Sequence, residues 1–244
     1  MRALLFDFGG TLDSPRHWLD RFVDHYQAAG VAITRRELDP AFDYATRLAY
    51  RSTVILRGRN LVDLLRFLVE TQLRFLDTAD TPLPAPTLRQ LRAVSRSDLV
   101  ERIVAPFAAE TAAGLAQSRV ILERLARRFT LGIVSNFYGN LDRVLADAGF
   151  GPLLHAIADS ANLGLYKPDL RLYRAALAMI EVAPPETAMV GDSLSKDCAP
   201  ARQLGLKSVW LRHQGADPNR PDAHCADFTI AALQELEDLR WDPS

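Results

Sequence analysis

The sequence predicts an α/β protein, a doubly wound parallel sheet with an inserted α-helical domain. Three features predict this fold: an apolar strand at the N-terminus, a long helical stretch after it, and regular alternation of strands and helices in the second half. Such alternation favours parallel strands with helices on both faces of the sheet. We therefore expect residues 1–13 and 118–244 to form an α/β core and residues 14–117 to form a helical cap.

The N-terminal strand is the most informative element. Its apolar run Ala3–Phe6 predicts a fully buried strand, and it ends on the carboxylate of Asp7. Gly9 and Gly10 follow, which indicates a tight loop directly after Asp7. A strand that delivers an Asp into a glycine-rich loop can place a nucleophile or a metal ligand at the mouth of a sheet.

The stretch from residue 14 to 117 has helical periodicity and no strand pattern. The first predicted helix ends near Gly30 and carries the apolar positions Trp18, Leu19, Phe22, Val23 and Tyr26; a second carries Leu61, Leu64, Leu65, Leu68 and Leu73. Three prolines, at positions 82, 84 and 86, predict a rigid break, and Thr87 is expected to cap a short helix. Pro106 predicts a further break.

The second half alternates between the two kinds of element. We expect helices at 120–128, 141–148, 170–180 and 199–204, and strands at 130–135, 156–158, 187–190, 208–211 and near Phe228.

Composition excludes several functional classes. A net charge of −1 argues against nucleic-acid binding and against binding to a membrane surface. No apolar run reaches the roughly 18 residues of a membrane span, and no signal-peptide pattern precedes the first strand. The two cysteines, Cys198 and Cys225, form no metal-type pair and no disulfide framework, so we expect a cytoplasmic protein with reduced thiols.

Polar residues with chemical potential follow the predicted strands. Ser135 and Asn136 end one strand, and Asp192 and Ser193 end another, with Asp197 shortly after them. Because ligands of open α/β sheets bind at the carboxyl ends of the strands, Asp7, Ser135 and Asp192 are expected to meet at one edge. Lys167, before Pro168 and Asp169, is one of only three lysines in the chain.

This order of features resembles the four motifs of the haloacid dehalogenase superfamily, which has a Rossmann-like core. The resemblance implies a magnesium-dependent hydrolase, in which Asp7 attacks phosphorus and forms an aspartyl-phosphate. The Mg²⁺ is then expected on Asp7, Asp192 and the backbone carbonyl of Gly9. Lys167 would neutralise the nucleophile and the phosphoryl group. The expected phosphate cradle is Ser135, Asn136 and Thr11, and the expected supporting residues are Ser193 and Asp197.

Gly9 departs from the family pattern, because ordinary phosphatases of the family have an Asp there that acts as acid and base. Such help is typically worth ~10²–10⁴-fold in rate. Asp13 is not an obvious substitute, since it should lie where the chain leaves for the cap. Three possibilities follow: a phosphatase with a good leaving group or another acid such as His17, a different reaction from the same intermediate, or a non-catalytic relative that binds a phosphorylated ligand or a protein partner.

Three related activities can be compared with these residues. A phosphonate-cleaving enzyme needs a cap lysine, and residues 14–117 contain none. A 2-haloacid dehalogenase typically has an aromatic residue where Gly9 stands. Its reaction needs no metal, whereas Asp192 suggests one, so it remains a minor alternative. A phospho-accepting receiver domain lacks a large helical insert.

The cap is expected to set specificity for a small phosphorylated metabolite. It has an arginine-rich segment, for which an anion pocket and solvated helix faces are both possible; its arginines are Arg47, Arg51, Arg57, Arg59, Arg66 and Arg74. Arg16 and His17 are candidate substrate contacts, whereas Trp18 fits the apolar core. The protein is expected to be a monomer or a homodimer.

Overall fold

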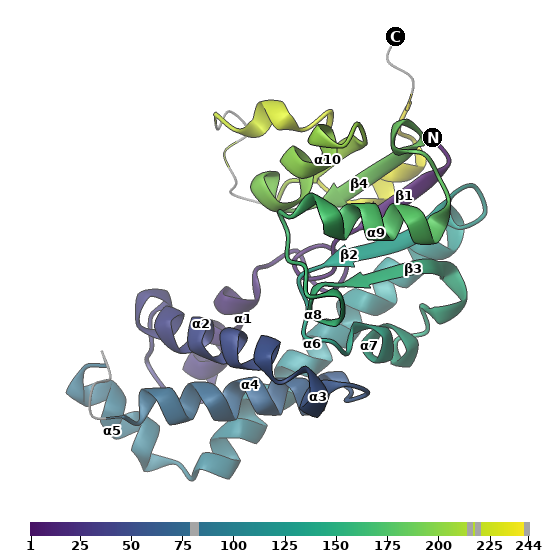
Figure 1. Ribbon diagram of the computed structural model, residues 1–244. Helices are drawn as coiled ribbons and strands as arrows, with labels where there is room; N and C mark the ends of the chain where they lie inside the picture. Colours follow the sequence, from purple (N-terminus) through teal and green to yellow (C-terminus); the bar gives the residue numbers. More distant parts are fainter. Residues whose placement is uncertain (79–82, 214–216, 218–220, 242–244) are drawn as a thin grey trace.

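A parallel six-stranded sheet forms the centre of the core, as expected (Figure 1). The computed structural model describes residues 1–78, 83–213, 217 and 221–241. The strands run in the spatial order β3-β2-β1-β4-β5-β6, and every neighbouring pair is parallel. Their bounds are β1 Ala3–Phe6, β2 Thr130–Ser135, β3 Leu154–Asp159, β4 Thr187–Gly191, β5 Lys207–Leu211 and β6 Phe228–Ile230.

Both faces of the sheet are buried, which explains the unbroken apolar run of β1. Leu4 and Phe6 belong to one hydrophobic cluster, and Ala3 and Leu5 belong to another. Successive residues of a strand point to opposite faces, so a strand covered on both sides must be apolar at every position. Helices α6 and α7 contribute to the first cluster, and α9 and α10 contribute to the second.

The core helices that follow β2 in the sequence are close to their predicted positions. They are α7 Leu141–Asp147, α9 Leu170–Ile180 and α10 Ala199–Gln203, with the short α8 Ser160–Leu163 after β3. A π-helical segment, Leu194–Cys198, follows β4 and leads into α10. It carries Lys196 and Asp197.

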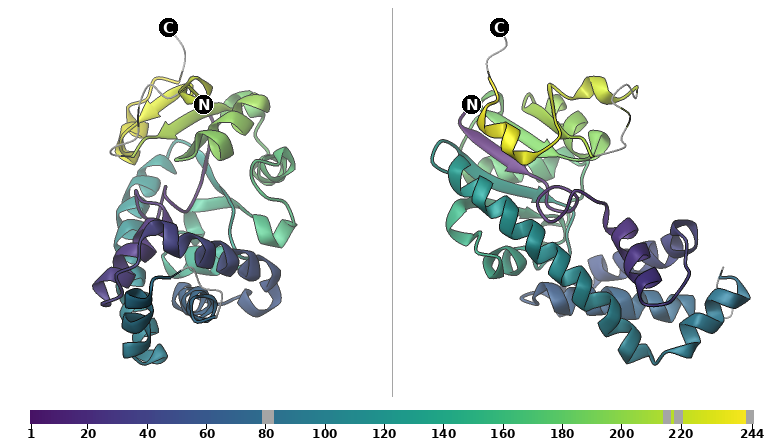
Figure 2. Two further views of the ribbon diagram at one scale, coloured as in Figure 1. Left: turned by 90° about the vertical axis from the view of Figure 1, so that its left-hand side faces the viewer. Right: turned by 180° about the vertical axis from the view of Figure 1, so that it is seen from behind.

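The segment between β1 and β2 is mostly helical and lies beside the sheet (Figures 1 and 2); we call its part expected to form the cap, residues 14–117, the insert. Its helices are α1 Trp18–Ala28, α2 Arg35–Arg51, α3 Thr53–Leu56, α4 Leu61–Leu76, α5 Ala85–Ala93 and the first part of α6 Arg96–Leu125. Pro84 precedes α5 as its N-cap and Pro86 lies in its first turn, whereas Pro82 lies outside the described residues.

Two predictions about α6 were wrong. Pro106 does not end a helix, and no helix begins at residue 120, because Arg96–Leu125 is one continuous helix that runs from the insert into the core (Figure 2). An internal proline costs a helix about 3 kcal/mol. Burial along the whole length outweighs that cost, since Ile103 and Phe107 pack in the insert while Ile121 and Leu122 pack on the core.

Candidate active site

Three of the predicted site residues meet at the carboxyl edge of the sheet. Asp7 follows β1, Ser135 ends β2 and Asp192 follows β4. These strands are immediate neighbours, with Phe6 paired to Ile133 on one side and to Val190 on the other. The register therefore delivers the three side chains to the same place.

A buried chain of polar contacts organises Asp7. Ser135 Oγ donates to Asp7 Oδ1 over 2.8 Å, and Lys167 Nζ lies 2.7 Å from the same oxygen. Lys167 Nζ also donates to Asp197 Oδ1 over 2.7 Å. No described residue hydrogen-bonds to Asp7 Oδ2. The carboxylate is thus held by one oxygen while the other remains open.

Electrostatics keep Lys167 charged in this buried position. Burial alone would lower the pKa of Lys167, but Asp197 and Asp7 raise it above its ordinary value. Burial raises the pKa of Asp197, and the Lys167 ammonium opposes that shift. Ser193 N–H donates to the second oxygen of Asp197 over 3.0 Å, so both Asp197 oxygens are engaged.

The Asn136 side chain holds the backbone of Lys167. Its Oδ1 accepts from Lys167 N–H over 2.7 Å, and its Nδ2 donates to Lys167 C=O over 3.2 Å. The amide therefore fixes the backbone of Lys167 at both of its hydrogen-bonding groups.

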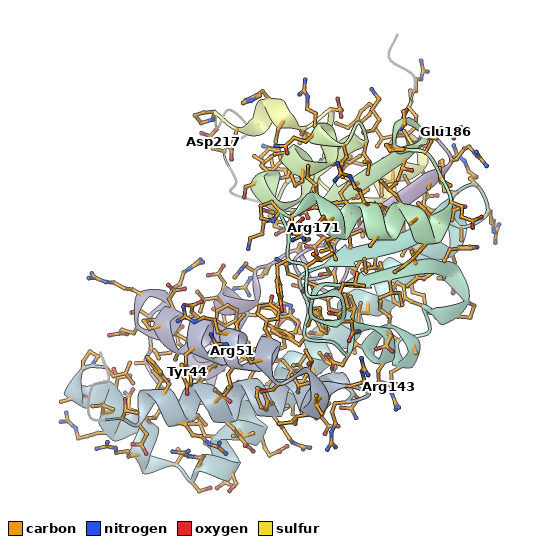
Figure 3. The ribbon with its side chains drawn as sticks, viewed as in Figure 1. Tyr44, Arg51, Arg143, Arg171, Glu186 and Asp217 are labelled. Carbon is orange, nitrogen blue, oxygen red and sulfur yellow. The ribbon has the colours of Figure 1, made fainter. Side chains whose placement is uncertain are left out.

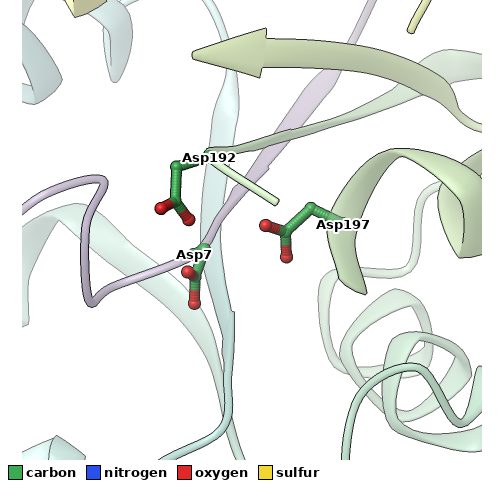
Figure 4. A group of neighbouring side chains, drawn as sticks. All are labelled: Asp7, Asp192 and Asp197. Carbon is green, nitrogen blue, oxygen red and sulfur yellow. The ribbon is translucent and has the colours of Figure 1, made fainter. Parts of the chain in front are cut away.

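The carboxylates of Asp7, Asp192 and Asp197 form an acidic cluster, with one oxygen of each within 4.8 Å of the others (Figure 4). Oxygen ligands of this kind suit a hard cation such as Mg²⁺. Because Asp197 is committed to Lys167 and Ser193, the donors that fit a cation here are Asp7 and Asp192. His213 Nε2 lies 3.4 Å from Asp192 Oδ2.

Gly10 leaves the room that Asp192 occupies. Its φ is +83°, and a Cβ at this position would lie 2.6 Å from Asp192 Oδ2. Both the backbone conformation and the close approach therefore require glycine.

Gly9, in contrast, could accept a small side chain. A Cβ there would make ordinary contact with Trp18 Nε1 at 3.5 Å.

Asp13 is held by three contacts. The Trp18 indole N–H donates to Asp13 Oδ2 over 2.6 Å, and Asp13 Oδ1 accepts from Gly10 N–H over 2.8 Å. Arg21 Nη1 also donates to Asp13 over 2.8 Å. Burial raises the pKa of Asp13 to about 6, against the lowering effect of Arg21. Asp13 thus anchors the loop and does not line the pocket described next.

A pocket of about 350 Å³ lies above Asp7, between the sheet edge and the insert. Its core side contains Asp7, Gly9, Ser135, Asn136, Lys167, Asp192 and Ser193. His17 also lines it, whereas Arg16 is exposed and pairs with Asp24. Thr11 does not line it, and the Thr11 hydroxyl is buried with no hydrogen-bond partner among the described residues.

The arginines of the arginine-rich segment contribute nothing to this pocket. None of its six arginines lines the pocket, and Arg51 is exposed on α2 (Figure 3). Arg47 pairs with Asp43 one helical turn away, and Arg74 pairs with Glu70 in the same way. Of the two interpretations, solvated helix faces, and not an anion pocket, describe these arginines.

Sequence reasoning missed the opposite wall of the pocket. Phe42, Thr46 and Tyr50 line it from α2, and Trp18 lines it from α1 although it is also buried as expected. The spacing of the α2 residues, one helical turn apart, was the available signal. Lys196 lines the pocket too, and its place inside the motif that contains Asp192 and Asp197 could have indicated it.

Comparisons with known proteins agree with this architecture. A family model described as haloacid dehalogenase-like hydrolase matches residues 1–205. A phosphoserine phosphatase from Thermus thermophilus is 36% identical over 137 residues, or 56% of this chain and 52% of that protein. A glyceraldehyde 3-phosphate phosphatase from Methanocaldococcus jannaschii is 34% identical over 91 residues, or 37% of this chain and 40% of that protein. The chain spans about half the length, or less, of these curated relatives.

Solved structures show the same fold. A dehalogenase has a TM-score of 0.64 at 19% identity, with 100% of this chain and 98% of that chain covered. A phosphatase from Thermococcus onnurineus has a TM-score of 0.55 at 21% identity, with coverage of 98% and 97%. At these identities the likeness concerns the fold alone. No helix in the described part of the chain is long and apolar enough to cross a membrane.

Proposed function

The chain belongs to the haloacid dehalogenase-like hydrolases, and from that membership we propose that it is a Mg²⁺-dependent phosphatase of a small phosphorylated metabolite. One observation carries the proposal: Asp7 is a buried carboxylate held at Oδ1 by Ser135 and Lys167, with Oδ2 open to the pocket side. The phosphatases among its relatives also support it.

In the proposed reaction, Asp7 Oδ2 attacks phosphorus and the bond from phosphorus to the leaving oxygen breaks. Water then cleaves the aspartyl-phosphate, which releases inorganic phosphate and restores Asp7. Lys167 supplies a fixed positive charge beside the phosphoryl group, and Ser135 and Asn136 keep the carboxylate and the lysine in position.

Asp7 and Asp192 would hold Mg²⁺, with the Gly9 carbonyl as the third expected protein ligand. When bound, the cation would offset the repulsion between the carboxylate and the phosphoryl oxygens. Thr11 remains a prediction for the cradle; its hydroxyl has no hydrogen-bond partner among the described residues and does not line the pocket.

The leaving group must depart without a carboxylic acid at position 9. His17 is the only imidazole among the described pocket residues, and burial together with the Arg35 charge lowers its pKa. Its Nδ1 accepts from Leu19 N–H over 3.2 Å, which leaves Nε2 to carry the proton of the neutral ring. His17 can therefore donate a hydrogen bond at neutral pH, but its lowered pKa reduces the fraction of the ring that carries the extra proton a general acid would transfer.

The test is Mg²⁺-dependent phosphate release from sugar, nucleotide, acyl and aryl phosphates, with Asp7→Asn as the control. We expect turnover in the wild type and a loss of several orders of magnitude in the variant. Release that is equal in both proteins would show that Asp7 is not the nucleophile.

Gly9 favours a second candidate, a nearly inactive relative that binds a phosphorylated ligand or a protein partner. This candidate predicts tight binding of phosphate mimics with Mg²⁺ and no turnover even of acyl phosphates. Halide release from a 2-haloacid, without phosphate release, would instead support the minor dehalogenase alternative.

A further inference from the structure

The wall of the pocket that faces Asp7 from the insert is aromatic. Phe42 and Tyr50 lie on one face of α2, and Trp18 lies beside them from α1. Helix α2 buries Ala41, Ala45 and Ala49, and the positions that follow each of these in sequence present Phe42, Thr46 and Tyr50 to the pocket. The α2 sequence thus pairs a small-residue face for packing with an aromatic face for the pocket.

Trp18 and Tyr50 form a connected surface with two rings from the core, Phe137 and Tyr138, and the Phe42 ring contacts His17. Tyr50 and Tyr138 have centroids 5.0 Å apart, and Trp18 and Phe137 have centroids 6.0 Å apart in an edge-to-face arrangement. Tyr166 backs Tyr50 at 4.9 Å. Such contacts restrain the rings and leave a preformed apolar surface against which a planar group can stack.

This wall carries no charge. Burial raises the pKa of Tyr138 to about 12 and raises that of Tyr50 further, so both hydroxyls stay protonated. The pocket's acidic residues and its lysines, Lys167 and Lys196, belong to the core. A substrate whose leaving group bears a carboxylate or a second phosphate would find no cationic partner on the insert side among the described residues.

The acidity of the leaving group also favours an aromatic substrate. A phenol has a pKa of about 10, close to that of a tyrosine side chain, whereas an alkyl alcohol is nearly as weak an acid as water, whose pKa is about 15.7. A phenolate can therefore depart without the acid that Gly9 lacks. An alkoxide cannot depart readily without one.

We propose that this pocket selects phosphomonoesters of phenols, with the aryl group stacked on Trp18, Phe42 and Tyr50. The proposal rests on the phosphatase function above and names its substrate class. The bond from phosphorus to the aryl oxygen breaks as Asp7 bonds to phosphorus, and the phenolate takes a proton from water. Hydrolysis of the aspartyl-phosphate then gives inorganic phosphate, so the net reaction converts an aryl phosphate and water into a phenol and phosphate.

Three substrates separate recognition from reactivity. Phenyl phosphate has both the ring and the good leaving group, benzyl phosphate has the ring with an alkoxide leaving group, and acetyl phosphate has a good leaving group without a ring. We expect phenyl phosphate to have the highest kcat/KM and the lowest KM. Benzyl phosphate should bind with a similar KM and react at least about 100-fold more slowly, in line with the missing acid.

The variants test whether the ring is recognised by the wall. Tyr50→Leu should raise the KM for phenyl phosphate roughly 3- to 10-fold and lower its kcat/KM relative to that of acetyl phosphate. Tyr50→Phe, which keeps the ring, should retain the wild-type ratio, and this guards against a folding defect. Tyr44→Leu is the matched control, because Tyr44 is on the same helix, is exposed and does not line the pocket (Figure 3).

The outcomes distinguish the two proposals. Asp7-dependent hydrolysis of acetyl phosphate with no preference for phenyl phosphate would overturn the substrate class and leave the phosphatase function intact. An unchanged ratio in Tyr50→Leu would also overturn it. No hydrolysis of any of the three would contradict the phosphatase function itself.

Discussion

Removal of the Lys167 ammonium should lower the free energy of unfolding by a large amount. In Lys167→Met, two carboxylates lose a partner that lies 2.7 Å from each. The side chains of Lys167, Asp7 and Asp197 are only 3%, 9% and 0% exposed, so water cannot replace the ammonium. Breaking a buried pair in this way costs about 3–5 kcal/mol.

The cost should depend on pH with a defined sign. Without Lys167, the folded-state pKa of Asp197, which burial already raises, rises further, because the ammonium that opposes that shift is gone. The folded variant therefore loses stability as the pH rises through the range between the unfolded and the folded pKa of Asp197. We expect the difference from wild type to be larger at pH 7 than at pH 5.

The assay is urea unfolding at both pH values, without divalent cations so that no metal replaces the lysine. Lys207→Met is the matched control, since Lys207 begins β5, is half-buried and has no ion pair among the described residues. The control should change the free energy of unfolding by less than about 1 kcal/mol. An equally small effect of Lys167→Met, or a larger effect at pH 5, would refute the reasoning.

Three further predictions concern the loop after β1 and the hydrogen bonds between Asn136 and the Lys167 backbone. Gly10→Ala should cost about 1–3 kcal/mol of stability and weaken Mg²⁺ binding, because its Cβ would meet Asp192, whereas Gly9→Ala should be tolerated; urea unfolding and Mg²⁺ titration of both variants check this. The pKa of Asp13 is raised from 3.8 to about 6, so the free energy of unfolding should fall by up to about 3 kcal/mol as the pH rises between those values, and a profile in Asp13→Asn should lack that component. Asn136→Ala should lower kcat more than it raises KM, since it frees the Lys167 backbone at both hydrogen bonds, and steady-state kinetics on one aryl phosphate would show it.

The core and the sheet-edge residues were predictable because their signals are local. An apolar run that ends on a polar residue fixes both a buried strand and the side chain at its end, so Asp7, Ser135 and Asp192 could be placed from sequence alone. Parallel pairing then brings those ends together without any knowledge of side-chain packing.

The continuity of α6 and the aromatic wall were not predictable in this way. Pro106 carries a strong local signal for a break, which long-range burial overrides. Phe42 and Tyr50 look like ordinary helix residues in the sequence; that the other face of α2 is buried through Ala41, Ala45 and Ala49 is known only from the packing. Trp18 fits an apolar stripe equally well whether or not one edge of it lines a pocket.

The central claim is that a phosphoryl group passes through Asp7. The most direct measurement is rapid acid quench of the Mg²⁺-loaded enzyme during turnover of phenyl or acetyl phosphate, followed by peptide mass mapping. The account predicts one phosphoryl group on the peptide that contains Asp7, and none in Asp7→Asn. Turnover without that adduct, and undiminished in Asp7→Asn, would contradict the account.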